Sequence, residues 1–301
     1  MKYSMNHGSL EIRIDAEFDQ KTLGDFFDVY RQSKKNRSAL LREKRITVNG
    51  STPANEEALL HKGDTMRLFF PEEAVDRLPA DKECTVVYED DFVYVVHKDA
   101  GVIIHGDPDD TGCLAAMAAA WQLNNGIQAP VRYIHRLDKE TTGLVLFVKC
   151  SFFQPWFDAM LEAKEVQRKY LAVCTGRAKI RQAFTWNGPI GRDRHVSGKY
   201  RVSKTGKEAL TKARCIARHG EYLLMDCSLE TGRTHQIRVH MSESKHPIIN
   251  DPLYGVPSAD FRNMCLWAYR LTFHDPLSHE EITVNDSFNK DYALFRRDIS
   301  L

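Results

Sequence analysis

One short stretch near the middle of the 301-residue chain constrains its fold more than any other. An apolar run from Val131 to Ile134 leads into this stretch, and a nearly unbroken apolar run from Leu144 to Val148 leads out of it. Both runs have the length and composition of buried strands. The polar loop between them closes with Thr-Thr-Gly, which is typical of a turn. The pattern predicts two core strands joined by a loop that a rigid scaffold holds in place.

The loop carries a carboxylate, Asp138, between two basic residues, Arg136 and Lys139. A charged loop is most often only a solvated turn, although rigidly held loops are also where functional residues concentrate. The string from His135 to Leu144, His-Arg-Leu-Asp-Lys-Glu-Thr-Thr-Gly-Leu, resembles the signature of the RluA-type family of RNA pseudouridine synthases. This resemblance implies that Asp138 is a catalytic nucleophile.

Further strings of the same family follow in order, so that the resemblance covers about residues 84 to 280. They are Arg168-Lys-Tyr170, Gly232-Arg-Thr-His-Gln-Ile-Arg238, His246-Pro-Ile248, Asp251-Pro-Leu-Tyr-Gly255 and the strand from Leu266 to Pro276. Three positions depart from the family pattern: Asp99 and Gly106 stand where prolines are usual, and Asn250 stands where a glycine is usual. These departures affect the shape of local loops rather than the residues expected to react.

The resemblance implies roles for six residues. It assigns catalysis to Asp138, to Tyr170 against the uracil ring, and to Arg233 as the partner of Asp138. It assigns substrate binding to Arg136, which would fill the position of a flipped-out uridine, to His135, and to Leu266 beneath the base. An arginine beside a carboxylate favours its ionised form through charge and hydrogen bonds.

No cofactor is expected, because the isomerisation of uridine oxidises nothing and transfers no external group. A metal site is also not expected, since His235 and His240 are five residues apart and do not share a helical face. The seven cysteines are scattered and never form a Cys-x-x-Cys pair, which predicts buried thiols rather than disulfides or a zinc ribbon.

The N-terminal residues predict a separate small domain. An alternating strand from Leu10 to Asp15 precedes a helix from Thr22 to Tyr30. A basic helix then runs into a short strand that ends in Val-Asn-Gly50, and a further strand follows from Asp64 to Phe70. This order resembles the S-four-like RNA-binding module. The alternative is a small α+β cap that binds nothing. We expect the RNA-binding domain at residues 1–75, a linker to about residue 83, and the catalytic domain at residues 84–301.

Positive charge is concentrated in two segments although the net charge is only +1. Residues 21–50 hold eight Lys and Arg against three Asp and Glu, a net charge of +5, and residues 164–218 hold fifteen against three, a net charge of +12. The rest of the chain therefore carries 1 − 5 − 12 = −16. Local fields of this kind attract phosphates, although a basic run is often only a solvated face.

Together these patterns predict an α+β protein in which a large, mainly antiparallel mixed sheet carries the Asp138 loop. The expected function is RNA uridine isomerisation in ribosomal RNA of the large subunit or in transfer RNA. We expect a cytoplasmic monomer, because no apolar run has the length of a membrane span and the N-terminus lacks a signal-peptide core. Two alternatives stay open: a non-catalytic RNA-binding or ribosome assembly factor, and a glycosylase that would release free uracil.

Overall fold

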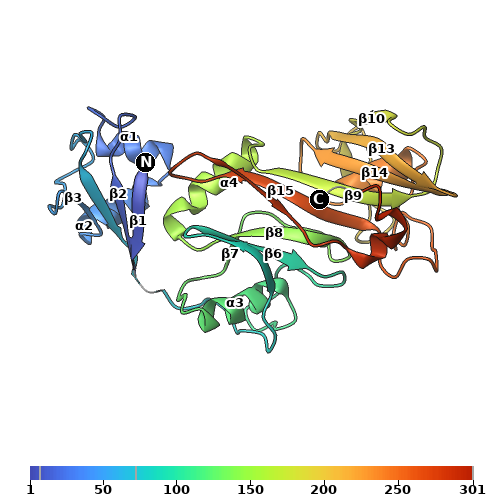
Figure 1. Cartoon of the computed structure of the whole chain (residues 1–301), viewed down its shortest axis with the longest axis horizontal. Helices are drawn as coiled ribbons and strands as arrows, with labels where there is room; N and C mark the ends of the chain where they lie inside the picture. The colour runs from blue at the N-terminus through green and yellow to red at the C-terminus, as the bar shows by residue number, and fades with distance from the viewer. Residues whose placement is uncertain (7, 72, 300–301) are drawn as a thin grey trace.

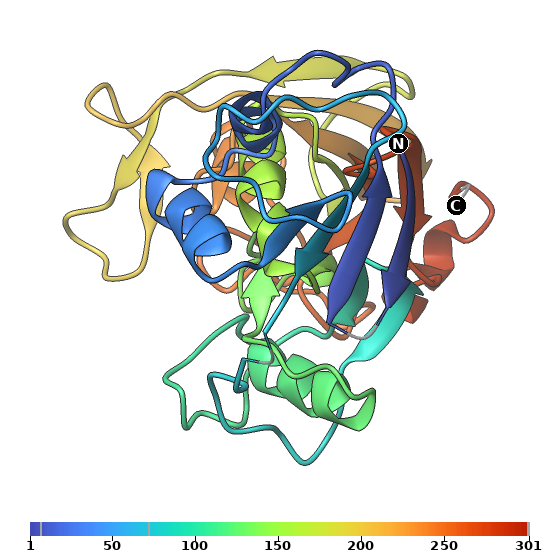
Figure 2. The same ribbon diagram turned by 90° about the vertical axis from the view of Figure 1, so that its left-hand side faces the viewer.

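The computed structural model describes residues 1–6, 8–71 and 73–299. A small N-terminal sheet with two helices lies at one end of the molecule, and a long twisted sheet makes up most of the rest (Figure 1). Seen from that end, the N-terminal strands lie nearest the viewer, and a yellow segment around residues 190–205 projects to the left (Figure 2). No helix in the described ranges is long and apolar enough to cross a bilayer.

The N-terminal part is an antiparallel sheet with the strand order β1-β2-β4-β3 and two helices beside it. Its elements are β1 (Lys2–Asn6), β2 (Ser9–Arg13), α1 (Leu23–Val29), α2 (Lys34–Arg42), β3 (Ile46–Val48) and β4 (Thr65–Phe69). Thr22 caps α1 through a capping box with Asp25, and the side chain of Ser33 caps α2. The sequence predicted these elements except β1, which it missed.

This N-terminal part shares a hydrophobic core with the remainder of the chain. The ring of Phe26 stacks near Phe152, and the ring of Tyr30 packs edge-on against Phe153. The Tyr30 hydroxyl also donates a buried hydrogen bond of 3.0 Å to the carbonyl of Pro276. The two predicted domains are therefore joined by packed aromatic side chains as well as by the chain, and the boundary near residue 75 stays a prediction.

The segment expected to be a linker runs along the helix α3 (Leu114–Asn124). The main-chain N–H of Ala80 donates to the carbonyl of Ala116, and that of Cys84 donates to Met117. Val75 and Ala80 pack against the cluster that α3 forms. The segment has no helix or strand among its described residues, but these contacts hold it to the catalytic part.

The large sheet confirms the predicted fold class. Its main path contains, in spatial order, β10 (Ala183–Trp186), β13 (Thr211–His219), β14 (Tyr222–Leu229), β9 (Gln167–Cys174), β15 (Leu266–His274), β8 (Thr142–Val148), β6 (Val93–Lys98) and β5 (Thr85–Glu89). Two short strands complete it: β16 (Glu281–Asn285) beside β15, and β7 (Arg132–Tyr133) beside β8. Among the described strands, only β15 and β8 pair in parallel.

Gly143 allows the close parallel pairing of β8 with β15. Its φ is +113°, and a Cβ placed on it would lie 2.3 Å from the carbonyl oxygen of Ala268. Only glycine adopts this backbone and leaves room for the neighbouring strand. The prediction that Thr-Thr-Gly forms a turn is wrong, because Thr142 and Gly143 already belong to β8 and the chain turns earlier, at Lys139 and Glu140. The start of β8 therefore pairs directly with the start of β15, next to Leu266.

Helices cover the sheet on both sides of this pairing. On one side, α3 packs against Tyr94, Val145 and Phe147 of β6 and β8. The turn η1 (Ser151–Phe153) and α4 (Gln154–Glu162) form the aromatic cluster that meets the N-terminal part. A further helix, α5 (Gln236–Glu243), packs near the pair β11 (Ile190–Arg192) and β12 (Tyr200–Val202). All seven cysteines are buried free thiols, as predicted.

Candidate active site

The Asp138 loop joins β7 to β8, and a buried lysine binds its main chain. Lys98 is fully buried at the end of β6, and its Nζ donates to the carbonyls of Asp99, Val102 and Lys139 at 2.8–2.9 Å. Burial lowers the pKa of Lys98 to about 8, although nearby carboxylates including Asp138 oppose this shift. Because Lys139 directly follows Asp138, this contact fixes the main chain beside the carboxylate.

Asp138 is ion-paired with Arg238 from α5. Arg238 Nη1 lies 3.0 Å from Asp138 Oδ2, while Nε and Nη2 bind the two oxygens of Asp251 at 2.7 and 2.9 Å. The Asp251 side chain is fully buried and that of Arg238 is 4% exposed, whereas that of Asp138 is 24% exposed. Burial opposes the charge of Arg238, but the hydrogen bonds and charges of Asp251 and Asp138 raise its pKa. The guanidinium therefore bridges a buried carboxylate and an accessible one.

The sequence-based choice of Arg233 as the partner of Asp138 is wrong in this structure. Arg233 is exposed in the loop before α5, where its Nε donates to the carbonyl of Glu208 at 2.8 Å. The side chain of Gln236 shapes this loop, because its Oε1 accepts the N–H of Arg233 at 3.0 Å. Arg238 is the third residue of α5 and is buried. One signal could have identified it: an arginine between Ile237 and Val239 is expected to be buried, and a buried arginine needs a carboxylate such as Asp251.

The helix α5 begins at a residue with an unusual backbone. Its N-cap is His235, which is left-handed with φ of +58°. This conformation turns the chain sharply between the exposed Arg233 and the buried Arg238. As a result, the two arginines of one short motif point to different environments.

A cleft of about 880 Å³ opens over Asp138. Tyr170 from β9 and Leu266 at the start of β15 line it, and both are at least 96% buried. Burial and the nearby charge of Asp138 raise the pKa of Tyr170, while Arg168 opposes this shift. The structure therefore brings together the predicted residues Asp138, Tyr170 and Leu266 in one cleft, although their roles stay predictions.

The rim of the cleft is basic. Five Lys and Arg side chains line it: Arg136 and Lys139 from the Asp138 loop, and Lys164, Arg168 and Arg233 from other segments. Arg136 is exposed and lies in the same loop as Asp138. A polyanion would meet these cations before reaching the buried floor. Within the described ranges, no group of three or more His, Cys, Asp or Glu side chains is placed to hold a metal ion.

His135 lies in the wall of the cleft and is almost fully buried. Its Nε2 accepts the main-chain N–H of Leu146 at 3.4 Å, which ties the loop to β8. Burial and the charge of Arg168 lower the pKa of His135 to about 3, so the ring is neutral at neutral pH. Its predicted contact with substrate stays a prediction, while its contact with β8 supports the loop.

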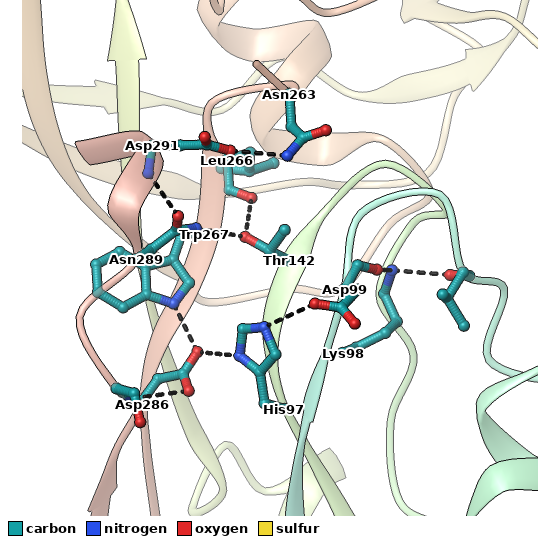
Figure 3. A network of polar contacts seen from close by, with 12 residues as sticks. His97, Lys98, Asp99, Thr142, Asn263, Leu266, Trp267, Asp286, Asn289 and Asp291 are labelled. Atoms are coloured by element: carbon teal, nitrogen blue, oxygen red, sulfur yellow. Dashed lines mark hydrogen bonds and ion pairs between the residues drawn. The ribbon is translucent and has the colours of Figure 1, made fainter. Parts of the chain in front are cut away.

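A second polar network lies behind Leu266 (Figure 3). Buried Asp286 accepts the indole N–H of Trp267 and lies 2.7 Å from His97 Nδ1. Thr142 Oγ1 is 3.5 Å from the carbonyl of Leu266 and accepts a hydrogen bond from Asn289. These contacts join β6, β8 and β15 directly behind the cleft, and thereby fix the strand ends that present Leu266.

The comparisons with known proteins agree with this geometry. The model of the RNA pseudouridylate synthase family matches residues 92–243. An uncharacterized RNA pseudouridine synthase of Bacillus subtilis (strain 168), YhcT, is 33% identical over 290 residues, which is 94% of each chain. The ribosomal large subunit pseudouridine synthase D of Xanthomonas campestris is 34% identical over 262 residues, covering 81% of this chain and 78% of the relative.

The fold agrees as well. The solved structure of human RNA pseudouridylate synthase domain containing 4 superposes with a TM-score of 0.57, covering 70% of this chain and 93% of that one, at 21% identity. At such low identity the superposition supports the fold alone. The match of half the chain to the family model, together with relatives aligned over most of their length, shows that this chain belongs to the RNA pseudouridylate synthase family, whose members are isomerases.

Proposed function

We propose that this chain isomerises specific uridines in ribosomal RNA of the large subunit, with Asp138 as its nucleophile. One observation carries the proposal: Asp138 is ion-paired with Arg238 on the floor of a basic cleft that also contains Tyr170 and Leu266. Relatives at about one-third identity, named for large-subunit ribosomal RNA, support the choice of substrate.

The reaction breaks the bond between ribose and the ring nitrogen of uridine, rotates the base, and rejoins it through carbon. Asp138 Oδ2 is bound by Arg238, whereas Oδ1 accepts no hydrogen bond from any residue in the described part of the chain. Oδ1 is thus the oxygen available for the reaction. Arg238 stabilises the ionised carboxylate, and Asp251 holds Arg238 in the required orientation.

The target base would lie between Tyr170 and Leu266. Tyr170 would stack on the uracil ring and assist removal of the final proton from carbon, and Leu266 would wall the opposite side. Reaching this site requires the nucleotide to leave its stack, which costs a few kcal/mol. Arg136 is exposed beside the cleft, and its planar guanidinium is suited to stack in the vacated position.

The basic rim would contact phosphates. Such contacts position an RNA without specifying its sequence. Arg233 belongs to this rim rather than to the reacting centre, because its side chain binds a main-chain carbonyl and faces solvent. In the N-terminal part, which we propose to be an S-four-like RNA-binding module, Lys34 and Lys35 are exposed on α2 and would add phosphate contacts.

Replacing both lysines by glutamate tests the N-terminal proposal. The salt dependence of RNA affinity should become shallower, since its slope counts phosphate contacts. An unchanged slope would mean that α2 does not touch RNA. The protein would act as a monomer, because one chain supplies all the side chains of the cleft, and it would act in the cytoplasm with its RNA.

Mapping pseudouridines in cells with and without this protein tests the main proposal. We expect at least one position in large-subunit ribosomal RNA to become uridine when the protein is absent, and to be restored by the wild-type chain. Loss confined to transfer RNA would contradict the proposed substrate. No change at any position would contradict the proposed reaction in the cell.

A further inference from the structure

A histidine faces the same carboxylate oxygen as Arg238. His235 Nε2 lies 3.9 Å from Asp138 Oδ2, the oxygen that accepts Arg238 Nη1 at 3.0 Å. The His235 side chain is 14% exposed and lines the cleft. Its left-handed backbone, at φ of +58°, directs the imidazole toward Asp138 at the start of α5. Non-glycine residues adopt this backbone uncommonly, and such strain concentrates at functional sites.

The other ring nitrogen of His235 is held by Tyr254. The Tyr254 hydroxyl lies 2.9 Å from His235 Nδ1, and it accepts a hydrogen bond of 2.7 Å from the main-chain N–H of Tyr200. Edge-on contacts of the His235 ring with the rings of Tyr200 and Tyr254 fix its plane further. Tyr200 belongs to β12, so the contacts reach from the β11–β12 hairpin to Asp138.

These contacts determine which nitrogen of His235 carries the proton. The Tyr254 oxygen already accepts the N–H of Tyr200, so its own proton points to the remaining partner, His235 Nδ1. A neutral imidazole that accepts at Nδ1 carries its proton on Nε2. With the opposite tautomer, the lone pair of Nε2 would face the Asp138 carboxylate, and the Tyr254 proton would have no acceptor among the described residues. The first arrangement is therefore the stable one.

The ring is neutral at neutral pH. Burial lowers the pKa of His235 and the charge of Arg238 adds to this effect, while the charges of Asp138 and Asp251 oppose it. His235 thus offers Asp138 an N–H dipole instead of a second full charge. An N–H can orient the carboxylate without neutralising it.

We propose that His235 is a positioning residue for Asp138, and that Tyr254 acts through His235 by fixing its tautomer. The 3.9 Å separation is longer than a hydrogen bond, but catalytic contacts of this kind shorten when the substrate fills the site. Arg238 and His235 would then hold Oδ2 together, which leaves Oδ1 directed at the uridine. This inference rests on the proposed role of Asp138.

Two substitutions of His235 test whether its N–H matters. Gln retains an N–H of similar reach, whereas Leu removes it, and both residues bear the same cost in the left-handed backbone. We expect His235→Leu to lower kcat about ten- to a hundredfold, because misplacing a reacting group by about 1 Å can cost about a hundredfold, with KM for the RNA changed less than about twofold. His235→Gln should recover most of this loss. Equal impairment of the two variants would overturn the proposal.

Tyr254→Phe tests the second step. It removes only the hydroxyl, so we expect kcat to fall about tenfold in the wild-type background and to change little in the His235→Leu background. Multiplying losses in the double variant would show that Tyr254 does not act through His235. Tyr222→Phe is the matched control, because it removes a hydroxyl that binds Ser258 and Asp260, and none of these three residues lines the cleft. It should leave kcat unchanged.

Failure of this inference is distinguishable from failure of the proposed function. Turnover by the wild-type chain that Asp138→Asn abolishes supports the proposed function, whatever the His235 and Tyr254 variants do. A wild-type chain that makes no pseudouridine, or an active Asp138→Asn variant, would instead overturn the function on which the inference rests. Unfolding midpoints measured for every variant separate loss of the positioning contact from loss of fold.

Discussion

Asp251→Asn tests whether Asp251 holds Arg238 in the position from which it binds Asp138. The substitution leaves Asp138 itself unchanged. Asp251 is buried and binds Arg238 through both of its oxygens, at 2.7 and 2.9 Å. The amide retains the size of the carboxylate and one acceptor oxygen. It removes the negative charge, however, and places an NH₂ group against an N–H of the guanidinium.

The expected loss of stability follows from those two contacts. Hydrogen bonds to charged groups contribute about 1.5–3 kcal/mol each. Removing one partner of a buried ion pair costs about 3–5 kcal/mol. Because Arg238 keeps its contact with Asp138, we expect the lower part of this range, a decrease of about 3 kcal/mol in the free energy of unfolding. The released guanidinium would also misplace Asp138, which should lower kcat about a hundredfold.

Urea unfolding measures the first effect and single-turnover pseudouridine formation measures the second. The unfolding midpoint should fall at an unchanged slope, since the substitution does not alter the surface exposed on unfolding. Asp260→Asn is the control: this exposed carboxylate accepts from the Tyr222 hydroxyl, and its loss should change stability by less than about 0.5 kcal/mol. If Asp251→Asn costs less than about 1 kcal/mol, Arg238 does not depend on Asp251 and the reasoning fails.

Three further predictions concern the surroundings of the site. Gly143→Ala should lower the free energy of unfolding by about 3 kcal/mol or more, because the new Cβ would meet the backbone of β15. The control Gly101→Ala, at φ of +83° with open space around it, should lower it by only about 1–2 kcal/mol. Burial opposes protonation of His97, but the hydrogen bond and charge of Asp286 raise its pKa. The stabilisation of the fold by protonated His97 should therefore be complete below about pH 6 and should disappear as pH rises through the pKa of His97 in the folded protein. The difference in unfolding free energy between wild type and His97→Gln should then shrink at alkaline pH, and a constant difference would refute the pairing. Arg238→Lys should abolish most turnover because one ammonium cannot bind two carboxylates as the fork does, while Arg233→Lys should mainly weaken RNA binding; equal effects of the two on kcat would contradict the assignment.

The sequence predicted the strands around Asp138 because their short apolar runs contain β-branched residues and flank a polar loop. It did not predict β13 as a defined strand, although the burial of Thr211–His219 alternates regularly. The inward residues of β13 include Ala213, Cys215 and Ala217, which are small and give a weak hydrophobic period. Strand β1 was missed for a similar reason, since only Tyr3 and Met5 of its residues face the core.

The identity of the arginine beside Asp138 could not be deduced from motif order alone. Arg233 and Arg238 belong to the same string, and only the left-handed turn at His235 decides which of them enters the core. The contribution of Asp251 and the shared core between Tyr30 and Phe153 likewise depend on tertiary contacts between distant segments. Local patterns carry no information about such pairings unless a family motif supplies it.

The most direct test of the central claim is turnover by purified Asp138→Asn on a large-subunit ribosomal RNA transcript. Asn keeps the size of the side chain and removes only the reactive charge. We expect the wild-type chain to convert a defined uridine to pseudouridine, and the variant to bind the same RNA with similar affinity while producing none. Pseudouridine formation by Asp138→Asn at a rate near that of the wild type would contradict the account, and free uracil as the wild-type product would show a glycosylase instead.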